Sequence, residues 1–248
     1  MGFFNKEKFK FGKLHKYNFM NKSNSIRSYL PDTRLATKAN ISSMLRSYRT
    51  IFLKPDEGAG GQGIYKLTKI GNKYILISGT VRKQYNSLDA LYNLHHRWFV
   101  KYKYVAQKGI ELLKYNKRPF DIRVMVQKNK SRQLEVTGII GRLAKQGRIV
   151  TNYHSGGTPL PVETLLSPHL KGTRRTEYIH KMEQIGKQAC IVLERIYRSR
   201  KAFGADIAID SKMRPWILEV NTKPDTKIFR ALKDKTMYKR VMRYKNLY

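Results

Sequence analysis

The sequence contains a single cysteine and no long apolar run. Cys190 alone cannot form an internal disulfide, and this usage favours a reducing compartment. No stretch reaches the roughly eighteen consecutive apolar residues that a membrane-spanning helix needs, and residues 1–30 lack the apolar segment of a signal peptide. We therefore expect a cytoplasmic protein that does not insert into a membrane.

Acidic residues are also scarce. There are 17 of them against 51 lysines and arginines, which gives a formal net charge of +34. Such a charge attracts polyanions over a Debye length of roughly 8 Å at physiological salt. The basic residues are spread along the whole chain, without zinc-finger spacing, an RRM signature or a recognition-helix pattern. Nonspecific affinity for nucleic acid is expected, and nucleic-acid binding as the main function is kept as an alternative.

With 41% hydrophobic residues, the chain has enough apolar material for a core. Strand-like and helix-like segments alternate without a regular β-α-β period, which favours the α+β class over a doubly wound sheet. The expected helices cover residues 41–48, 87–98 and 175–200, and the expected strands cover residues 50–54, 64–70, 73–77, 102–107, 120–127, 134–143, 147–151, 205–210 and 215–220.

Helix boundaries follow from capping residues and apolar spacing. Asn40 suits the N-cap of the first helix and Ser87 that of the second. In the second helix, four apolar side chains at helical spacing are expected on the core face. These are Leu88, Leu91, Leu94 and Trp98.

The two ends of the chain are expected to lie outside this pattern. Residues 1–30 are expected to form a basic, partly extended lead-in. Residues 227–248 are expected to form a basic tail, helical at most and mobile at its end.

A glycine-rich segment follows the strand that ends at Lys54. It holds four glycines in six positions and leads into another strand, so it is neither a Walker A loop nor the dinucleotide fingerprint, which both lead into helices. Glycines let backbone N–H groups converge on an anion, and a lysine at the strand end adds positive charge. The segment indicates a phosphate-binding loop, with a flexible hairpin turn as the alternative.

Two carboxylates and an amide are expected to meet near the C-terminus. Glu219 and Asn221 project from one face of a strand, because strand side chains alternate. If residues 211–214 form a four-residue turn, Asp210 opposes Pro215 and Asp206 opposes Glu219. Such oxygen donors suit Mg²⁺. The alternative is a set of salt bridges to some of the many basic residues.

Together these segments resemble the ATP-grasp superfamily, in which a lysine and a glycine-rich loop grip ATP and a Glu-x-Asn strand holds magnesium. More narrowly, the chain resembles the endospore coat-associated YheC/YheD-type proteins. The matching pieces occur in order over residues 30–226: Pro31-Asp32-Thr33, Phe52–Ile64, Gln107–Ile110, Arg118–Arg123, Gly138–Leu143, Asn152 through Gly157, and Asp206–Pro224.

The resemblance implies an ATP-grasp fold with two α+β subdomains that clasp the nucleotide. It divides the chain into a basic lead-in (1–30), an N-lobe (31–107), a C-lobe with the metal site (108–226) and a basic tail (227–248). The N-terminal domain that precedes most ATP-grasp folds is expected to be largely missing. A partner chain or the basic surface would then supply its substrate contacts.

The resemblance also assigns residues to roles. ATP would contact Lys54, Gly58, Gly60, Gly61, Gln62, Gly63, Gln107, Lys108, Ile110 and Asp121, with the Gln107–Ile110 backbone reading adenine. Mg²⁺ would be held by Asp206, Glu219 and Asn221. The transferred phosphate or substrate carboxylate would face Arg123 and Arg142, with Lys223 assisting and Asn152 bordering the acceptor site. Without the resemblance, both arginines read equally well as ordinary exposed side chains.

The expected activity is that of an ATP- and Mg²⁺-dependent carboxylate–amine ligase that acts through an acylphosphate. The charge of +34 suggests an acidic peptide or another polyanion as substrate. The first alternative is a non-catalytic, polyanion-binding structural protein of this fold that associates with endospore-coat proteins.

Overall fold

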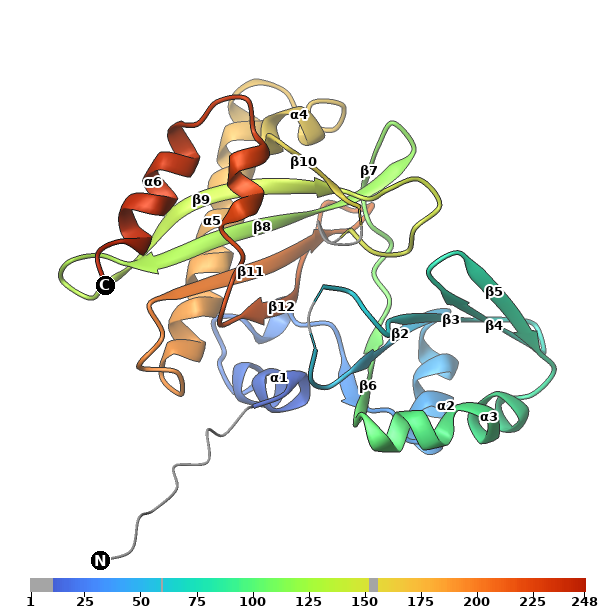
Figure 1. Ribbon diagram of the computed structural model, residues 1–248. Helices are drawn as coiled ribbons and strands as arrows, with labels where there is room; N and C mark the ends of the chain where they lie inside the picture. The colour runs from blue at the N-terminus through green and yellow to red at the C-terminus, as the bar shows by residue number, and fades with distance from the viewer. Residues whose placement is uncertain (1–10, 59, 152–155) are drawn as a thin grey trace, which may run out of the picture.

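The computed structural model describes residues 11–58, 60–151 and 156–248. These residues form two antiparallel sheets, each covered by helices (Figure 1). The first sheet runs in the order β1-β6-β2-β3-β4-β5. Its strands are β1 (Thr33–Leu35), β2 (Thr50–Pro55), β3 (Tyr65–Ile70), β4 (Lys73–Ser78), β5 (Val81–Tyr85) and β6 (Tyr104–Lys108). We call this sheet and its helices the first lobe.

The second sheet follows in the chain and runs in the order β10-β9-β8-β11-β12, with β7 paired to β8 beside this path. Its strands are β7 (Lys114–Tyr115), β8 (Arg118–Lys128), β9 (Leu134–Leu143), β10 (Thr158–Leu160), β11 (Ala202–Ile209) and β12 (Pro215–Asn221). This second lobe confirms the α+β class. The division of the chain at residues 107 and 108 stays a prediction.

Two helices cover the first sheet, α2 (Lys38–Ser47) and α3 (Leu88–Lys101). Ser87 caps α3 as expected, since its side chain accepts a hydrogen bond from Ala90. The cap of α2 is Thr37 instead of Asn40, because the helix begins earlier and Asn40 is the donor. The expected inner face of α3 was half wrong: Leu88 and Leu91 are buried, whereas Leu94 and Trp98 are exposed.

Helices cover both faces of the second sheet, and adjacent residues of β8 show this. Val124 and Val126 belong to the core under α5 (Gly172–Glu194) and α4 (Val162–Leu166). Met125 faces the opposite side, where η3 (Lys227–Ala231) and α6 (Thr236–Lys245) pack (Figure 1). The expected basic tail is therefore helical, and Phe229 and Val241 are buried in this second layer.

The expected extended lead-in is instead helical from Lys13 onward. It contains α1 (Lys13–Asn21) and η1 (Arg27–Tyr29). Met20, Ile26 and Leu30 are buried in the core of the second lobe. The segment thus packs against the second lobe, whose strands begin many residues later in the chain. Local sequence patterns do not reveal such a long-range contact.

Two smaller expectations also differ. Residues 147–151 form no strand, and the edge of the second sheet is β10 instead. β5, which pairs with β4 beyond the expected hairpin, was missed. Among the residues that the structure describes, no helix is long and apolar enough to cross a membrane.

Candidate functional site

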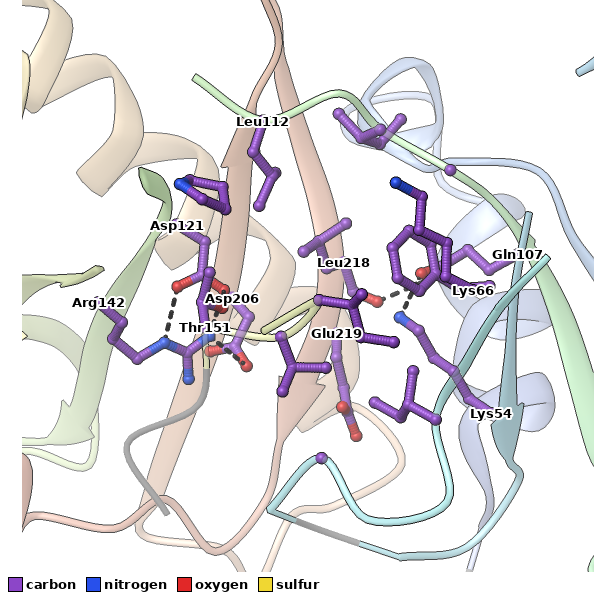
Figure 2. Close-up of a pocket in the computed structure, with 18 of the residues that line it drawn as sticks. Lys54, Lys66, Gln107, Leu112, Asp121, Arg142, Thr151, Asp206, Leu218 and Glu219 are labelled. Carbon is purple, nitrogen blue, oxygen red and sulfur yellow. Dashed lines mark hydrogen bonds and ion pairs between the residues drawn. The ribbon is translucent and has the colours of Figure 1, made fainter. Parts of the chain in front are cut away.

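A cavity of about 1000 Å³ lies between the lobes and is lined by both sheets (Figure 2). In Figure 2, Arg142 and Asp206 lie at one side, Lys54 and Gln107 at the other, and Glu219 between them. The cavity brings together nearly all of the expected site residues: Lys54, Gly58, Gly60, Gly61, Gln62, Gln107, Lys108, Ile110, Asp121, Arg123, Arg142, Asp206, Glu219, Asn221 and Lys223.

Among the expected site residues that the structure describes, Gly63 does not line the cavity. Asn152 lies outside the described part of the chain. Gly63 ends the glycine-rich loop, and its carbonyl oxygen accepts a hydrogen bond from the Tyr104 hydroxyl at 2.9 Å. A Cβ atom on Gly63 would meet that hydroxyl at 2.9 Å, so this glycine permits packing.

The glycine-rich loop joins two antiparallel strands, β2 and β3, as the strand–loop–strand pattern predicted. Its lining glycines have φ values of 132° (Gly58), 73° (Gly60) and 80° (Gly61), in the region that other residues rarely adopt. The chain can therefore turn tightly at the edge of the cavity, in a conformation that residues with a side chain rarely adopt.

Lys54 leaves β2 toward the cavity and is held by Gln107 of the neighbouring strand β6. The ammonium donates to Gln107 Oε1 at 2.6 Å. The same amide group donates from Nε2 to Thr33 Oγ1 at 3.1 Å and to the Leu218 carbonyl oxygen at 3.2 Å. Gln107 thus connects Lys54 of the first lobe to β12 of the second.

Burial lowers the pKa of Lys54 to about 8, and the nearby Glu219 carboxylate offsets this only in part. A charged ammonium is costly to bury unless an anion compensates it. The site therefore favours an anionic ligand next to Lys54.

The expected pairing of Asp206 with Glu219 is confirmed, by an unexpected route. Ile209 pairs with Pro215, so the turn comprises residues 210–214. It is one residue longer than the expected turn at residues 211–214. A β-bulge between Asp206 and Ile207 leaves Leu218 without an opposing residue on β11. Beyond the bulge, Asp206 again pairs with Glu219 as expected. The freed Leu218 carbonyl is the one that Gln107 contacts.

Asp206 is shared between two arginines. Arg123 donates to both of its carboxylate oxygens, at 3.1 Å for Nη2 to Oδ2. Arg142 Nη2 lies 3.0 Å from Oδ2 of Asp206. Asn221 Nδ2 also donates to Oδ2, at 3.3 Å. Both arginines line the cavity and bind acidic side chains, and the expectation that they face the transferred phosphate or substrate carboxylate stays a prediction.

Asp121 completes this buried network. Arg142 donates to it through Nε at 2.8 Å and through Nη2 at 2.5 Å. The Thr151 hydroxyl donates to Asp121 Oδ2 at 2.7 Å. Burial opposes every charge here, but the mutual attraction outweighs it, raising the pKa of Arg142 and lowering that of Asp206. Two arginines and two aspartates thus pair with one another, and their formal charges balance.

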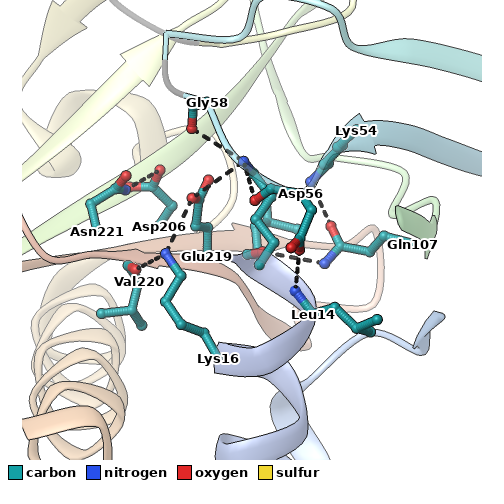
Figure 3. A network of polar contacts seen from close by, with 12 residues as sticks. Leu14, Lys16, Lys54, Asp56, Gly58, Gln107, Asp206, Glu219, Val220 and Asn221 are labelled. Atoms are coloured by element: carbon teal, nitrogen blue, oxygen red, sulfur yellow. Dashed lines mark hydrogen bonds and ion pairs between the residues drawn. The ribbon is translucent and has the colours of Figure 1, made fainter. Parts of the chain in front are cut away.

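Helix α1 adds two lysines that the sequence did not single out. Lys13 Nζ lies 3.9 Å and Lys16 Nζ 3.7 Å from Glu219 Oε1 (Figure 3). Lys13 also donates to the Gly58 carbonyl oxygen at 3.2 Å, and Lys16 to that of Val220 at 3.0 Å. Among 51 basic residues, neither had a local signal that set it apart.

The glycine-rich loop in turn holds α1. Asp56 Oδ1 accepts a hydrogen bond from the Leu14 N–H at 2.7 Å, and the Asp56 carbonyl accepts one from the Lys13 N–H at 2.9 Å (Figure 3). No side chain of α1 caps its own N-terminus. A residue of the first lobe therefore caps a helix that packs in the second.

The segment expected to read adenine lies at the end of β6. Its backbone is partly used within the fold, because the N–H of Lys108 donates to Asp32 and that of Gly109 to Thr50. The Lys108 ammonium lies 4.4 Å from the ring centroid of Trp216 in the second lobe and 5.2 Å from that of Tyr48 in the first. This cation bridges the two lobes beside the cavity.

The donor set at Glu219 and Asn221 fits a hard cation. Both side chains line the cavity from one face of β12 and offer oxygen ligands. Within the described ranges, no group of three or more His, Cys, Asp or Glu residues could hold a metal ion by itself. Mg²⁺ is commonly held by one or two carboxylates together with substrate phosphates.

The fold recurs in solved enzymes. Two N5-carboxyaminoimidazole ribonucleotide synthetases, one from Thermotoga maritima and one in complex with ADP, superpose with TM-scores of 0.51 and 0.56. They are 12% and 11% identical in sequence, and the match covers 96% and 94% of this chain but 49% and 50% of theirs. At this identity the similarity concerns the fold alone, and the fold is that of the ATP-grasp class.

The family "YheC/D like ATP-grasp" matches residues 1–248, so the chain belongs to this family. The endospore coat-associated protein YheD of Bacillus subtilis (strain 168) is 27% identical over 229 residues, covering 88% of this chain and 49% of YheD. YheC of the same strain is 24% identical over 207 residues, covering 82% and 56%. The chain thus spans about half the length of these relatives.

Proposed function

We propose that this chain binds Mg-ATP in the cavity between its lobes and uses it to join a carboxylate to an amine. One observation carries the proposal: a buried lysine, a glycine-rich loop and a Glu-x-Asn strand line one cavity. Each alone has an ordinary structural explanation. Their convergence from opposite lobes does not follow from packing.

In this proposal, the phosphates lie between the glycine-rich loop and β12. Lys54 and Lys13 provide charge, and the backbone at Gly58, Gly60 and Gly61 provides N–H donors. The lowered pKa of Lys54 supports this role, because an adjacent phosphate would relieve the cost of its burial. The adenine would lie along Gln107–Ile110, beside the inter-lobe cation of Lys108.

Glu219 and Asn221 would hold Mg²⁺, which when bound neutralises charge on the transferring phosphate. Lys13 and Lys16 stand near Glu219 and balance its charge until then. Asp206 could bind the same Mg²⁺ only through a carboxylate oxygen that already accepts a hydrogen bond from Arg123 or Arg142.

For the reaction, a substrate carboxylate attacks the γ-phosphorus, which gives an acylphosphate and ADP, and an amine then displaces phosphate. Arg123, Arg142 and Lys223 would orient and stabilise the transferring group. Asp121 would hold Arg142 in place instead of contacting the nucleotide. Asn152 would border the acceptor. An acidic peptide or protein is the substrate that the net charge of +34 favours.

Thermal unfolding with and without Mg-ATP tests the nucleotide site. Ligand at one hundred times its dissociation constant adds about 2.7 kcal/mol to the folded state. The shift should shrink strongly in Glu219→Ala and persist in a matched surface variant, Glu177→Ala. If a folded sample showed no shift at millimolar nucleotide, the proposal would fail.

The ion pairs among Arg123, Arg142 and the two aspartates favour a second candidate function, that of a non-catalytic scaffold. Arg123, Arg142 and Asp206 satisfy one another, as they would in a scaffold without catalysis. The relatives' names suggest association with the endospore coat for such a scaffold. ADP release that depends on an added carboxylate separates the two: the ligase requires it, and the scaffold shows none.

A further inference from the structure

An exposed patch of apolar and basic side chains lies on α3 and its C-cap residue, away from the cavity. It consists of Leu94, Arg97, Trp98, Lys101 and Tyr102, which we call the α3 patch. Leu94 is 62% exposed, Trp98 55% and Tyr102 42%. None of the five lines the cavity between the lobes.

The patch is preorganised. The rings of Trp98 and Tyr102 stack with centroids 5.2 Å apart and planes at 14°. The Lys101 ammonium lies 6.0 Å from the Trp98 centroid and 5.5 Å from that of Tyr102. Two aromatic rings that already stack on each other lose little conformational entropy when a partner binds.

The core of the first lobe does not need these side chains. Helix α3 buries Leu88, Leu91 and Phe99 against the sheet. Leu94 and Trp98 are exposed, although their spacing suits a core face. Large apolar side chains gathered on one exposed face mark interaction sites more often than scattered ones do.

The charged residues within the sequence segment that carries the patch are all basic, and the acid nearest to it is Asp56 of the glycine-rich loop, whose N–H donates to the carbonyl oxygens of Tyr102 and Lys103. Between Ala90 and Ile110 the sequence has four lysines and arginines and no acid. Arg97 and Lys101 flank the aromatic pair, and Lys103 follows it. A partner must therefore bring negative charge next to apolar side chains. Single-stranded nucleic acid also combines charge with stacking, but the aliphatic surface of Leu94 fits a protein side chain better.

We propose that the α3 patch docks an acidic protein segment that carries a leucine or an aromatic side chain. The apolar side chain packs on Leu94 and Trp98, and flanking carboxylates pair with Arg97 and Lys101. This surface is separate from the nucleotide site, so the inference stands whether or not the chain is a ligase.

The test uses the full chain and a short, fluorescein-labelled peptide of Glu and Asp with two central leucines, in physiological salt. Fluorescence anisotropy should show binding that weakens about tenfold or more in Trp98→Ala and in Lys101→Glu, as expected for central contacts. Val81→Ser and Lys22→Glu remove an exposed apolar and an exposed basic residue elsewhere and should bind as wild type does.

Trp98 also reports directly. The chain has two tryptophans, and Trp216 is only 6% exposed. Binding should shift the emission to the blue in wild type but not in Trp98→Phe. The proposal is wrong if the same peptide with serines for leucines binds equally well, or if oligo(dT) binds the patch more tightly. It is also wrong if the peptide does not bind, or if Trp98→Ala changes nothing.

Discussion

The carboxylate of Asp56 accepts a hydrogen bond from the backbone of Leu14 at 2.7 Å, and through it the glycine-rich loop caps helix α1. The loop belongs to the first lobe, and α1 packs in the core of the second. The position of Lys13 and Lys16 at Glu219 therefore depends on an acid beside the loop. This relationship makes Asp56 a positioning residue for the site.

Asp56→Ala should destabilise the protein by about 1 kcal/mol, the usual cost of a lost N-cap. Affinity for Mg-ATP should fall as well, because Lys13 loses its fixed position. Urea unfolding and calorimetric titration would measure the two effects. Asp89→Ala is the matched control, since Asp89 pairs with Lys38 on the surface and such pairs contribute little.

Gly12→Ala should act like Asp56→Ala. A Cβ atom on Gly12 would lie 1.8 Å from Asp56 Oδ2, so the carboxylate must move and the cap breaks. The double variant should be hardly less stable than either single one, because both remove the same contact. Additive losses in urea unfolding would contradict this account.

Arg142→Met should cost about 3–5 kcal/mol, the range for leaving a buried charge without its partner. It deprives Asp121 of two hydrogen bonds and Asp206 of one ion pair. Arg82→Met, on the exposed strand β5, should change the free energy of unfolding by no more than about 0.5 kcal/mol. Equal effects in urea unfolding would mean that the network does not stabilise the fold.

The same network predicts loss of stability in acid. The pKa of Asp206 is lowered in the folded state: burial opposes this shift, but Arg123 and Arg142 outweigh it. Its stabilisation is complete above the unfolded pKa of about 4 and is lost as pH falls through the folded value. The free energy of unfolding should drop below about pH 4, and less steeply in Asp206→Asn. An identical acid slope in the variant would argue against this origin.

The lowered pKa of Lys54 predicts that affinity for Mg-ATP declines at high pH. Its pKa is about 8 in the folded protein, so it loses its charge above that pH. Mg-ATP affinity should fall by up to about tenfold per pH unit there, and Lys54→Arg should not show the decline. Conversely, the free energy of unfolding should rise from about pH 8 to about 10.4, because the unfolded chain then binds more protons.

Much of the site could be derived from residue order alone. The lysine, the glycine-rich loop and the Glu-x-Asn strand are local patterns, and glycine conformation and strand alternation are local physics. The face shared by Glu219 and Asn221 follows from alternation within one strand. The hairpins β3–β4 and β8–β9 likewise followed from turn residues between apolar runs.

Other features depended on tertiary contacts. The turn at residues 210–214 was one residue longer than expected, and the bulge at Leu218 compensated for it. The predicted pairing of Asp206 and Glu219 was thus confirmed although the turn was wrong. Helix α1 could not be placed from sequence, since its cap comes from Asp56 and its apolar residues pack against distant strands.

The sequence by itself determined the local patterns from which we predict phosphate and metal binding, because those patterns lie within single strands and loops. Only the tertiary structure decided what those residues touch. Burial brought Arg123 and Arg142 to Asp206 and Asp121, since isolated charges are too costly in a protein interior and must pair. The packing of α1 placed Lys13 and Lys16 near Glu219. Trp98 is exposed, although its helical spacing had predicted a core position.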